Sequence, residues 1–168
     1  PEGKPTRVGA TVKDITEYVI ENHLECLNNI KEQNRMTRTI VTLPSMPQFR
    51  EIRHIDGDYT LKPEDAYKHF DDSVAAICDF ERRDYLYEVP YRTMIKTGFP
   101  NLITAGRTAA ADGYAWDVLR VIPPAILTGQ AAGIASAMAV DLRTDICKID
   151  VAELQKTLEE QNVMIHFD

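Results

Sequence analysis

The last third of the sequence contains the pattern with the clearest chemical meaning. A short apolar stretch, 101–105, ends at Gly106, a Gly- and Ala-rich loop follows, and an uncharged stretch runs from Val121 to Val140. This pattern predicts a strand, a loop and a helix that begins at Pro123-Pro124, because proline is favoured in the first helical turn. A helix N-terminus presents unpaired amides and about half a positive charge, so we expect an anionic group to bind there.

The composition of the predicted helix favours close packing. Its small residues are Gly129, Ala132, Gly133, Ala135 and Ser136. They would let a neighbouring backbone approach closely, as in helices that flank a dinucleotide site, but a tightly packed α/β core helix has the same composition. The stretch is long enough to span a membrane, yet its proline, glycine and polar residues make insertion unfavourable, so we expect a buried helix.

Other reactive residue types show no spacing typical of a site. The histidines, predicted to be exposed or core residues, are His23, His54, His69 and His166. The three cysteines lie far apart without a Cys-x-x-Cys pair, which argues against a zinc site or a disulfide framework and favours a reducing, cytoplasmic compartment. Asp56-Gly57-Asp58 lacks the remaining ligands of a calcium loop and is predicted to be a turn. No serine has the setting of a hydrolase nucleophile.

Periodicity and turn residues predict the elements that surround this pattern. A helix is expected over 12–33, begun by Thr11 and Asp14 in an arrangement close to a capping box. A short helix should start at 62–65, and a polar helix capped by Asp150 should run to 161. The predicted strands are 36–43, 49–55, 73–80 and 85–89.

Size and charge limit the function classes. The chain has 168 residues, enough for one ordinary domain but hardly for two. A net charge of -7 and a pI near 5.1 argue against a nucleic-acid or anionic-membrane surface, which needs clustered Lys and Arg. The sequence begins at Pro1 without a signal layout, so we expect it to be part of a longer protein.

Three segments resemble a known family in the same order along the chain. The stretch NLITAGRTAAADGYAWDVLRVIPPAILTGQAAG, residues 101–133, resembles the closing flavin-contact segment of a family of FAD-dependent oxidoreductases. In that family Ala-Gly-Arg ends a strand, and Arg-Val-x-Pro opens a Gly-Gln-Ala-Ala-Gly helix. VPYRTMI at 89–95 and REIRHIDGDYTL at 50–61 are similar to two further family segments. Some sequences that resemble this family are labelled xanthan lyases.

The resemblance implies a mixed α/β (α+β) fragment. It would comprise part of an FAD-binding Rossmann-like domain and part of a substrate-side β-sheet region. In this interpretation residues 1–100 form the substrate-side region, 101–140 the C-terminal strand, loop and helix of the FAD-binding domain, and 141–168 a helical tail.

The resemblance also implies which residues meet the cofactor. Gly106, Arg107 and Thr108 would lie beside the ribityl and pyrophosphate groups of FAD. The start of the helix would approach the pyrimidine edge of the flavin and stabilise the negative charge of the reduced flavin. Its residues are Arg120, Val121, Ile122 and Pro123. Tyr91 and Arg92, candidates for catalysis, would face a small organic substrate.

Three structural alternatives stand beside these roles. Tyr91 could be a half-buried residue at a strand end, and Arg92 could pair with an acidic neighbour. Arg120 could pair with Asp117 or Asp112.

The sequence departs from the family pattern in two respects. Ala110 and Gly113 stand where members commonly have Ser and His, so proton transfer at these positions is not expected. No G-x-G-x-x-G occurs, so the turn that binds the pyrophosphate should belong to an upstream part of the same protein, and this chain alone should bind FAD weakly or not at all.

Two other functions remain open at this stage. A carbohydrate-binding or polysaccharide-processing module is suggested by aromatic rings that could stack on sugars: Tyr85, Tyr87, Tyr91, Tyr114 and Trp116. A catalytically silent structural domain is the other.

Overall fold

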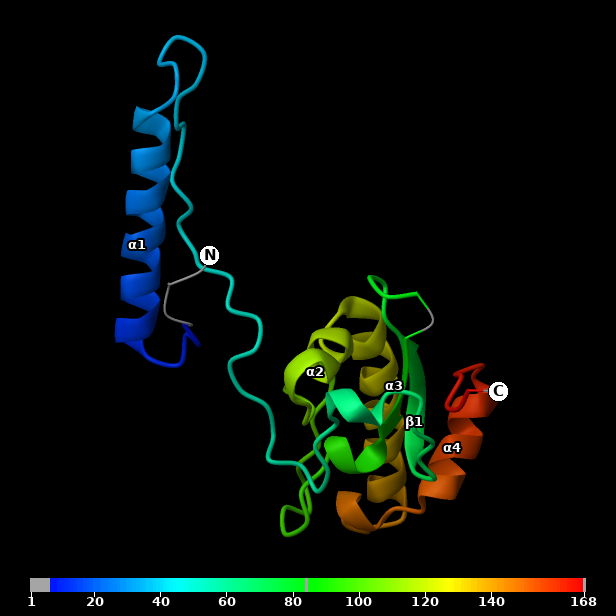
Figure 1. The fold of residues 1–168 in the computed structure, drawn as a ribbon. Coiled ribbons are helices and arrows are strands. Elements are labelled where there is room, and N and C mark those ends of the chain that lie inside the picture. The colour runs from blue at the N-terminus through cyan, green and yellow to red at the C-terminus, as the bar shows by residue number, and fades with distance from the viewer. Residues whose placement is uncertain (1–6, 84, 168) are drawn as a thin grey trace. The chain divides into compact units, whose positions relative to one another are not determined.

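The computed structural model describes residues 7–83 and 85–167 (Figure 1). The chain divides into two compact units, Pro1–Ile52 and Arg53–Asp168. The helices and strands are α1 (Val12–Lys31), β1 (Ser73–Cys78), β2 (Leu86–Pro90), α2 (Gly113–Leu119), α3 (Ile122–Asp141) and α4 (Val151–Glu160). Single 3-10 turns are η1 (Pro63–Asp65), η2 (Tyr91–Thr93), η3 (Gly106–Thr108) and η4 (Ile146–Lys148).

The first unit consists of helix α1 and the segment that follows it. Thr11 caps α1 by accepting the Asp14 amide at 3.1 Å, as the sequence predicted. Arg7 binds Glu17 and, at 2.6 Å, Glu21, which lie one turn apart on the helix. No residue of α1 is buried, so this helix contributes little apolar burial to the unit.

The predicted strands at 36–43 and 49–55 are wrong. Residues 36–52 have no helix or strand, and Met36 and Val41 are largely exposed. Their β-branched and alternating residues suit a strand, but a strand needs a second strand to pair with, and no described strand pairs with this segment.

A β-hairpin is the centre of the second unit. Strands β1 and β2 pair antiparallel with Ala76 opposite Glu88, within the regions predicted as strands. The C-terminal segment runs along β1. Met164 O accepts the Ala76 amide at 2.8 Å, and Ile165 O accepts the Ser73 hydroxyl at 2.5 Å.

Helices α3 and α4 pack on this hairpin and on each other (Figure 1). The buried residues of α3 are Pro124, Thr128, Ala131 and Ala135, whose small side chains allow close approach. Leu154 and Leu158 of α4 are buried in the same core. Both helices lie where the sequence predicted, and the Asp150 side chain caps α4 by accepting the Ala152 amide.

The region before α3 differs from the prediction. Residues 101–105 form no strand; only Ile103 makes an isolated antiparallel bridge, to Ile95. The predicted loop contains helix α2, whose Ala115, Trp116, Val118 and Leu119 are buried. Tertiary burial therefore stabilises a short helix in a Gly- and Ala-rich stretch that has weak helical periodicity.

Helices combined with a small two-stranded sheet fit the expected mixed α/β class. In the part of the chain that is described, no single helix is long and apolar enough to cross a membrane; α2 and α3 would reach that length together but are bent by 79°.

Candidate functional site

The second unit brings together the segments around residues 55–61, 92–95 and 104–112. The backbone hydrogen bonds that join them are Ile55 N–H to Thr108 O (2.9 Å), Asp58 N–H to Ile95 O (3.1 Å), Tyr59 N–H to Arg92 O (3.1 Å), Leu61 N–H to Ala110 O (3.0 Å), Thr104 N–H to Met94 O (2.8 Å) and Ala110 N–H to Thr93 O (2.8 Å). The three segments that resemble one family along the sequence are thus one structural unit in space, apart from residues 50–52.

Gly106 anchors the 3-10 turn η3 to the start of α3. Its amide donates to the Thr128 hydroxyl at 2.9 Å, and that hydroxyl donates to Pro124 O at 2.7 Å. The backbone of Gly106 has φ +61°, and a Cβ at this position would lie 3.1 Å from Ala125 Cβ. Glycine is therefore required both by the conformation and by the close approach to the helix. Thr128 had no predicted role, since nothing in the local sequence shows that Gly106 lies beside it.

The N-terminus of α3 is open to solvent. Ile122 is 76% exposed, Pro123 is also exposed, and Val121 precedes them as an N-cap without a side-chain hydrogen bond. The first turn contains no acidic residue, so no carboxylate there neutralises the positive end of the helix. Because Pro123 and Pro124 lack amide hydrogens, Ile122 is the one residue among the first three of α3 that can donate a backbone N–H.

The two arginines near α3 differ in their partners. Arg107 is exposed and forms no hydrogen bond or ion pair through its side chain with the described residues, while its carbonyl accepts the Trp116 indole N–H at 2.9 Å. Arg120 lies at the end of α2 and binds Asp117 through two guanidinium nitrogens, one of them Nε at 3.1 Å. The Asp117 pairing was one of the alternatives for Arg120, and it offsets part of the positive charge beside α3.

Tyr91 is a core residue. It is 2% exposed, and its hydroxyl donates to Ile146 O at 2.9 Å. Burial raises the pKa of Tyr91 well above its ordinary value. Its hydroxyl is therefore neutral and already bonded.

Arg92 lines an open groove of about 630 Å³. Its guanidinium binds both oxygens of Asp72 at 2.9 Å, so this arginine is paired with an acidic neighbour. Lys68, His69, Asp58 and Asp71 also line the groove, which makes its charge mixed in sign.

The tyrosines considered for sugar stacking pack mainly against one another. Tyr85 meets Tyr87 and Tyr114 edge to face, with ring centroids 5.5 and 5.8 Å apart, and Tyr87 is buried. Tyr114 binds Asp79, and this hydrogen bond together with desolvation raises the pKa of Tyr114 to about 12. Edge-to-face packing leaves few ring faces free to stack on a sugar.

Residues 77–158 match the family model described as FAD dependent oxidoreductase. The match supports an FAD-dependent oxidoreductase family. No curated protein and no solved structure matches the chain. The matched residues of this chain include Tyr91, Arg92, η3 and the start of α3. The segment at 50–61, which resembles another family segment, lies outside the match.

Proposed function

We propose that this chain is the C-terminal part of an FAD-dependent oxidoreductase and contributes one side of its flavin site. Gly106, Arg107 and Thr108 would form the edge beside the ribityl and pyrophosphate groups. Arg120 and the α3 start, Val121 to Pro123, would form the edge beside the flavin ring. FAD, when bound, supplies the acceptor of electrons or hydride from an organic substrate.

One observation is the main support for this proposal. The positive end of α3 is exposed, has no side-chain cap and no acidic neighbour in its first turn, and lies beside η3, whose Arg107 is exposed. An anionic cofactor would complement these features through the helix dipole and the arginine charge. All of these residues belong to the range that matches the family.

In the proposed site, the role of α3 is to stabilise negative charge on the flavin. Its N-terminus and Arg107 would favour negative charge, while Thr128 holds Gly106 and thereby fixes the distance between η3 and the helix. The proposed pyrophosphate turn lies in another part of the same protein, because this chain contains no G-x-G-x-x-G.

The groove beside Arg92 is the proposed substrate side. Arg92 is held rigidly by Asp72, and Lys68 donates to Tyr59 and Asp65 at the same groove. In this position Arg92 would orient a polar substrate group through the guanidinium N–H donors that Asp72 does not accept. Tyr91 would support the wall of the groove rather than transfer a proton, because its hydroxyl is bonded to Ile146 O.

A charge placed at the α3 N-terminus tests the proposal. In the intact protein, Ile122→Glu puts a carboxylate at the exposed start of the helix. It should weaken FAD binding by roughly tenfold or more, which corresponds to about 1.4 kcal/mol. Fluorescence titration with FAD measures the affinity.

Val140→Glu is the matched control, because Val140 is equally exposed at the other end of α3. It should leave FAD affinity unchanged. Unchanged affinity in Ile122→Glu would overturn the proposed placement of the flavin, provided that circular dichroism shows both variants to be folded.

The 168-residue chain alone should be purified without a yellow colour, and stable retention of FAD by it would refute the assignment of the pyrophosphate turn to another part of the protein.

A further inference from the structure

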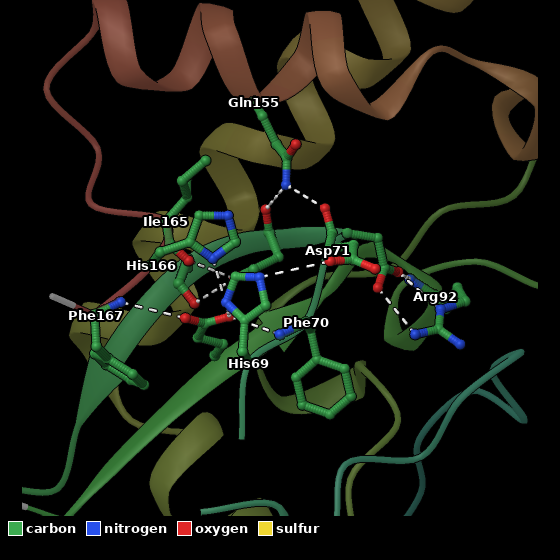
Figure 2. A network of polar contacts seen from close by, with 12 residues as sticks. His69, Phe70, Asp71, Arg92, Gln155, Ile165, His166 and Phe167 are labelled. Atoms are coloured by element: carbon green, nitrogen blue, oxygen red, sulfur yellow. Dashed lines mark hydrogen bonds and ion pairs between the residues drawn. The ribbon is translucent and has the colours of Figure 1, made fainter. Parts of the chain in front are cut away.

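Two histidines that are far apart in the sequence converge on one buried carboxylate. His69 precedes β1, His166 lies near the C-terminus, and Glu88 is in β2. One ligand atom from each of the three residues lies within 4.8 Å of the others. Figure 2 shows the two imidazole rings side by side. Their centroids are 4.5 Å apart. No spacing in the sequence predicts this cluster.

The distances suit a shared metal ion. Glu88 Oε2 is 3.3 Å from His69 Nδ1 and 3.0 Å from His166 Nδ1. With metal–ligand bonds of about 2.0–2.2 Å, two ligand atoms of a tetrahedral zinc ion lie roughly 3.4 Å apart. Zinc favours imidazole nitrogen together with carboxylate oxygen, and three protein ligands leave the fourth position for water.

Glu88 Oε2 lies beside three nitrogens. The Phe70 amide and His166 Nδ1 bind it by hydrogen bonds of 2.8 and 3.0 Å, and His69 Nδ1 lies 3.3 Å away as an ion-pair contact. The third nitrogen is thus close to the carboxylate without adding a hydrogen bond to it. A metal ion would take one lone pair from Glu88 Oε2 and one from each imidazole. The second lone pair of Oε2 would remain for the Phe70 amide.

The surrounding structure holds the three side chains in place. The side chain of Glu88 is 2% exposed, and its other oxygen accepts the Phe167 amide at 3.2 Å. Together with the bond from the Phe70 amide, this contact fixes the position of the Glu88 carboxylate beside the two imidazoles.

The histidine-bearing segments are also fixed. Gln155 of α4 donates to the carbonyls of Asp71 and Ser73, and Ser73 donates to Ile165 O (Figure 2). His69 Nε2 lies 3.5 Å from Oδ1 of the exposed Asp71. The side chains of His69 and His166 are 63% and 32% exposed, which leaves a solvent path to the cluster.

We propose that His69, Glu88 and His166 form a zinc site that ties the C-terminal segment to the β-hairpin. His69 and His166 lie outside the matched range 77–158, and the site does not depend on the proposed flavin function. The ion would link the C-terminal segment to the hairpin, and its fourth coordination position would be open to water. It borders the groove beside Arg92, which His69 and Asp71 also line.

Zinc titration of the untagged 168-residue chain tests the proposal. After treatment with a chelator and its removal, isothermal titration calorimetry with zinc chloride should show one ion bound per chain. His69→Ala and His166→Ala should each weaken binding by at least about tenfold. Cobalt(II) should give the visible absorption of a tetrahedral site in the wild type and lose it in both variants.

His23→Ala is the control, because His23 is in the first unit and binds Pro44 O. It should bind zinc like the wild type. His69 is exposed, so His69→Ala should remain folded by circular dichroism and give a valid comparison. Failure of the wild type to bind zinc stoichiometrically would overturn the site, and so would unchanged affinity in the folded variant His69→Ala.

Discussion

At the scale of single residues, Gly57 shows how closely the three family-like segments meet. A Cβ at Gly57 would lie 2.8 Å from Ala110 Cβ, 2.9 Å from Tyr59 O and 3.1 Å from Arg92 O. Two of these neighbours are backbone atoms in hydrogen-bonded segments, so they cannot move without breaking those contacts.

We predict that Gly57→Ala lowers the free energy of unfolding by about 1–3 kcal/mol through overpacking. Urea denaturation followed by circular dichroism measures the change. Gly129→Ala is the matched control: Gly129 lies in α3 with open space around it, so alanine should stabilise the chain by roughly 0.5–1 kcal/mol. Equal effects of the two substitutions would contradict the packing of Gly57.

Asp65 predicts a pH dependence of stability. Its buried carboxylate accepts the Tyr59 hydroxyl at 2.7 Å, the Lys62 amide at 3.0 Å and the Lys68 ammonium at 3.1 Å. Burial raises the pKa of Asp65, but these bonds outweigh burial and lower the pKa below its ordinary value. The stabilisation is therefore complete above the unfolded-state pKa of about 3.9 and is lost as the pH falls below it.

The wild type should be more stable than Asp65→Asn at pH 7, and the difference should shrink as the pH falls from about 4 toward 2. Urea denaturation at a series of pH values measures this difference. The neighbouring Glu64→Gln replaces an exposed carboxylate and should show no such trend. A difference that stays constant across the acid range would show that Asp65 is not responsible.

At the scale of elements, the contact between η3 and α3 depends on one hydroxyl. Thr128→Val keeps the side-chain shape but leaves the buried Gly106 amide without its acceptor. We expect a loss of about 1–3 kcal/mol in stability and faster hydrogen exchange at the Gly106 amide.

Ser136→Ala is the control for Thr128→Val. The Ser136 hydroxyl donates only to Ala132 O within α3, at 2.7 Å, so its loss should change stability far less. If Gly106 exchanged at the wild-type rate in Thr128→Val, the turn and the helix would not be joined by this bond.

At the scale of the whole molecule, the described apolar residues that are buried and form the core lie between Leu61 and Ile165. Residues 53–168 produced alone should therefore unfold in one cooperative transition with urea. Residues 1–52 alone should melt gradually, because α1 buries no residue and most helical stability in proteins comes from the packing of an apolar face. A gradual transition for 53–168 would mean that its core is not sufficient for folding.

Local interactions explain why the sequence predicted several elements correctly. The caps at Thr11 and Asp150 and the proline start of α3 act between residues a few positions apart. The family resemblance likewise uses residue types in short segments. Short stretches of sequence therefore contain the information that determines these features.

Long-range contacts explain the rest. The segment 101–105 was predicted as a strand, but only its partners could decide whether a ladder forms, and it makes a single bridge. Helix α2 forms because its apolar side chains are buried in the core, and the hydrogen bond from the Gly106 amide to Thr128 forms only in the folded chain. His69 and His166 looked isolated because each meets Glu88 only when the loop before β1, the hairpin and the C-terminal segment pack together. Such contacts depend on the free energy of the whole core, which no short stretch of sequence contains.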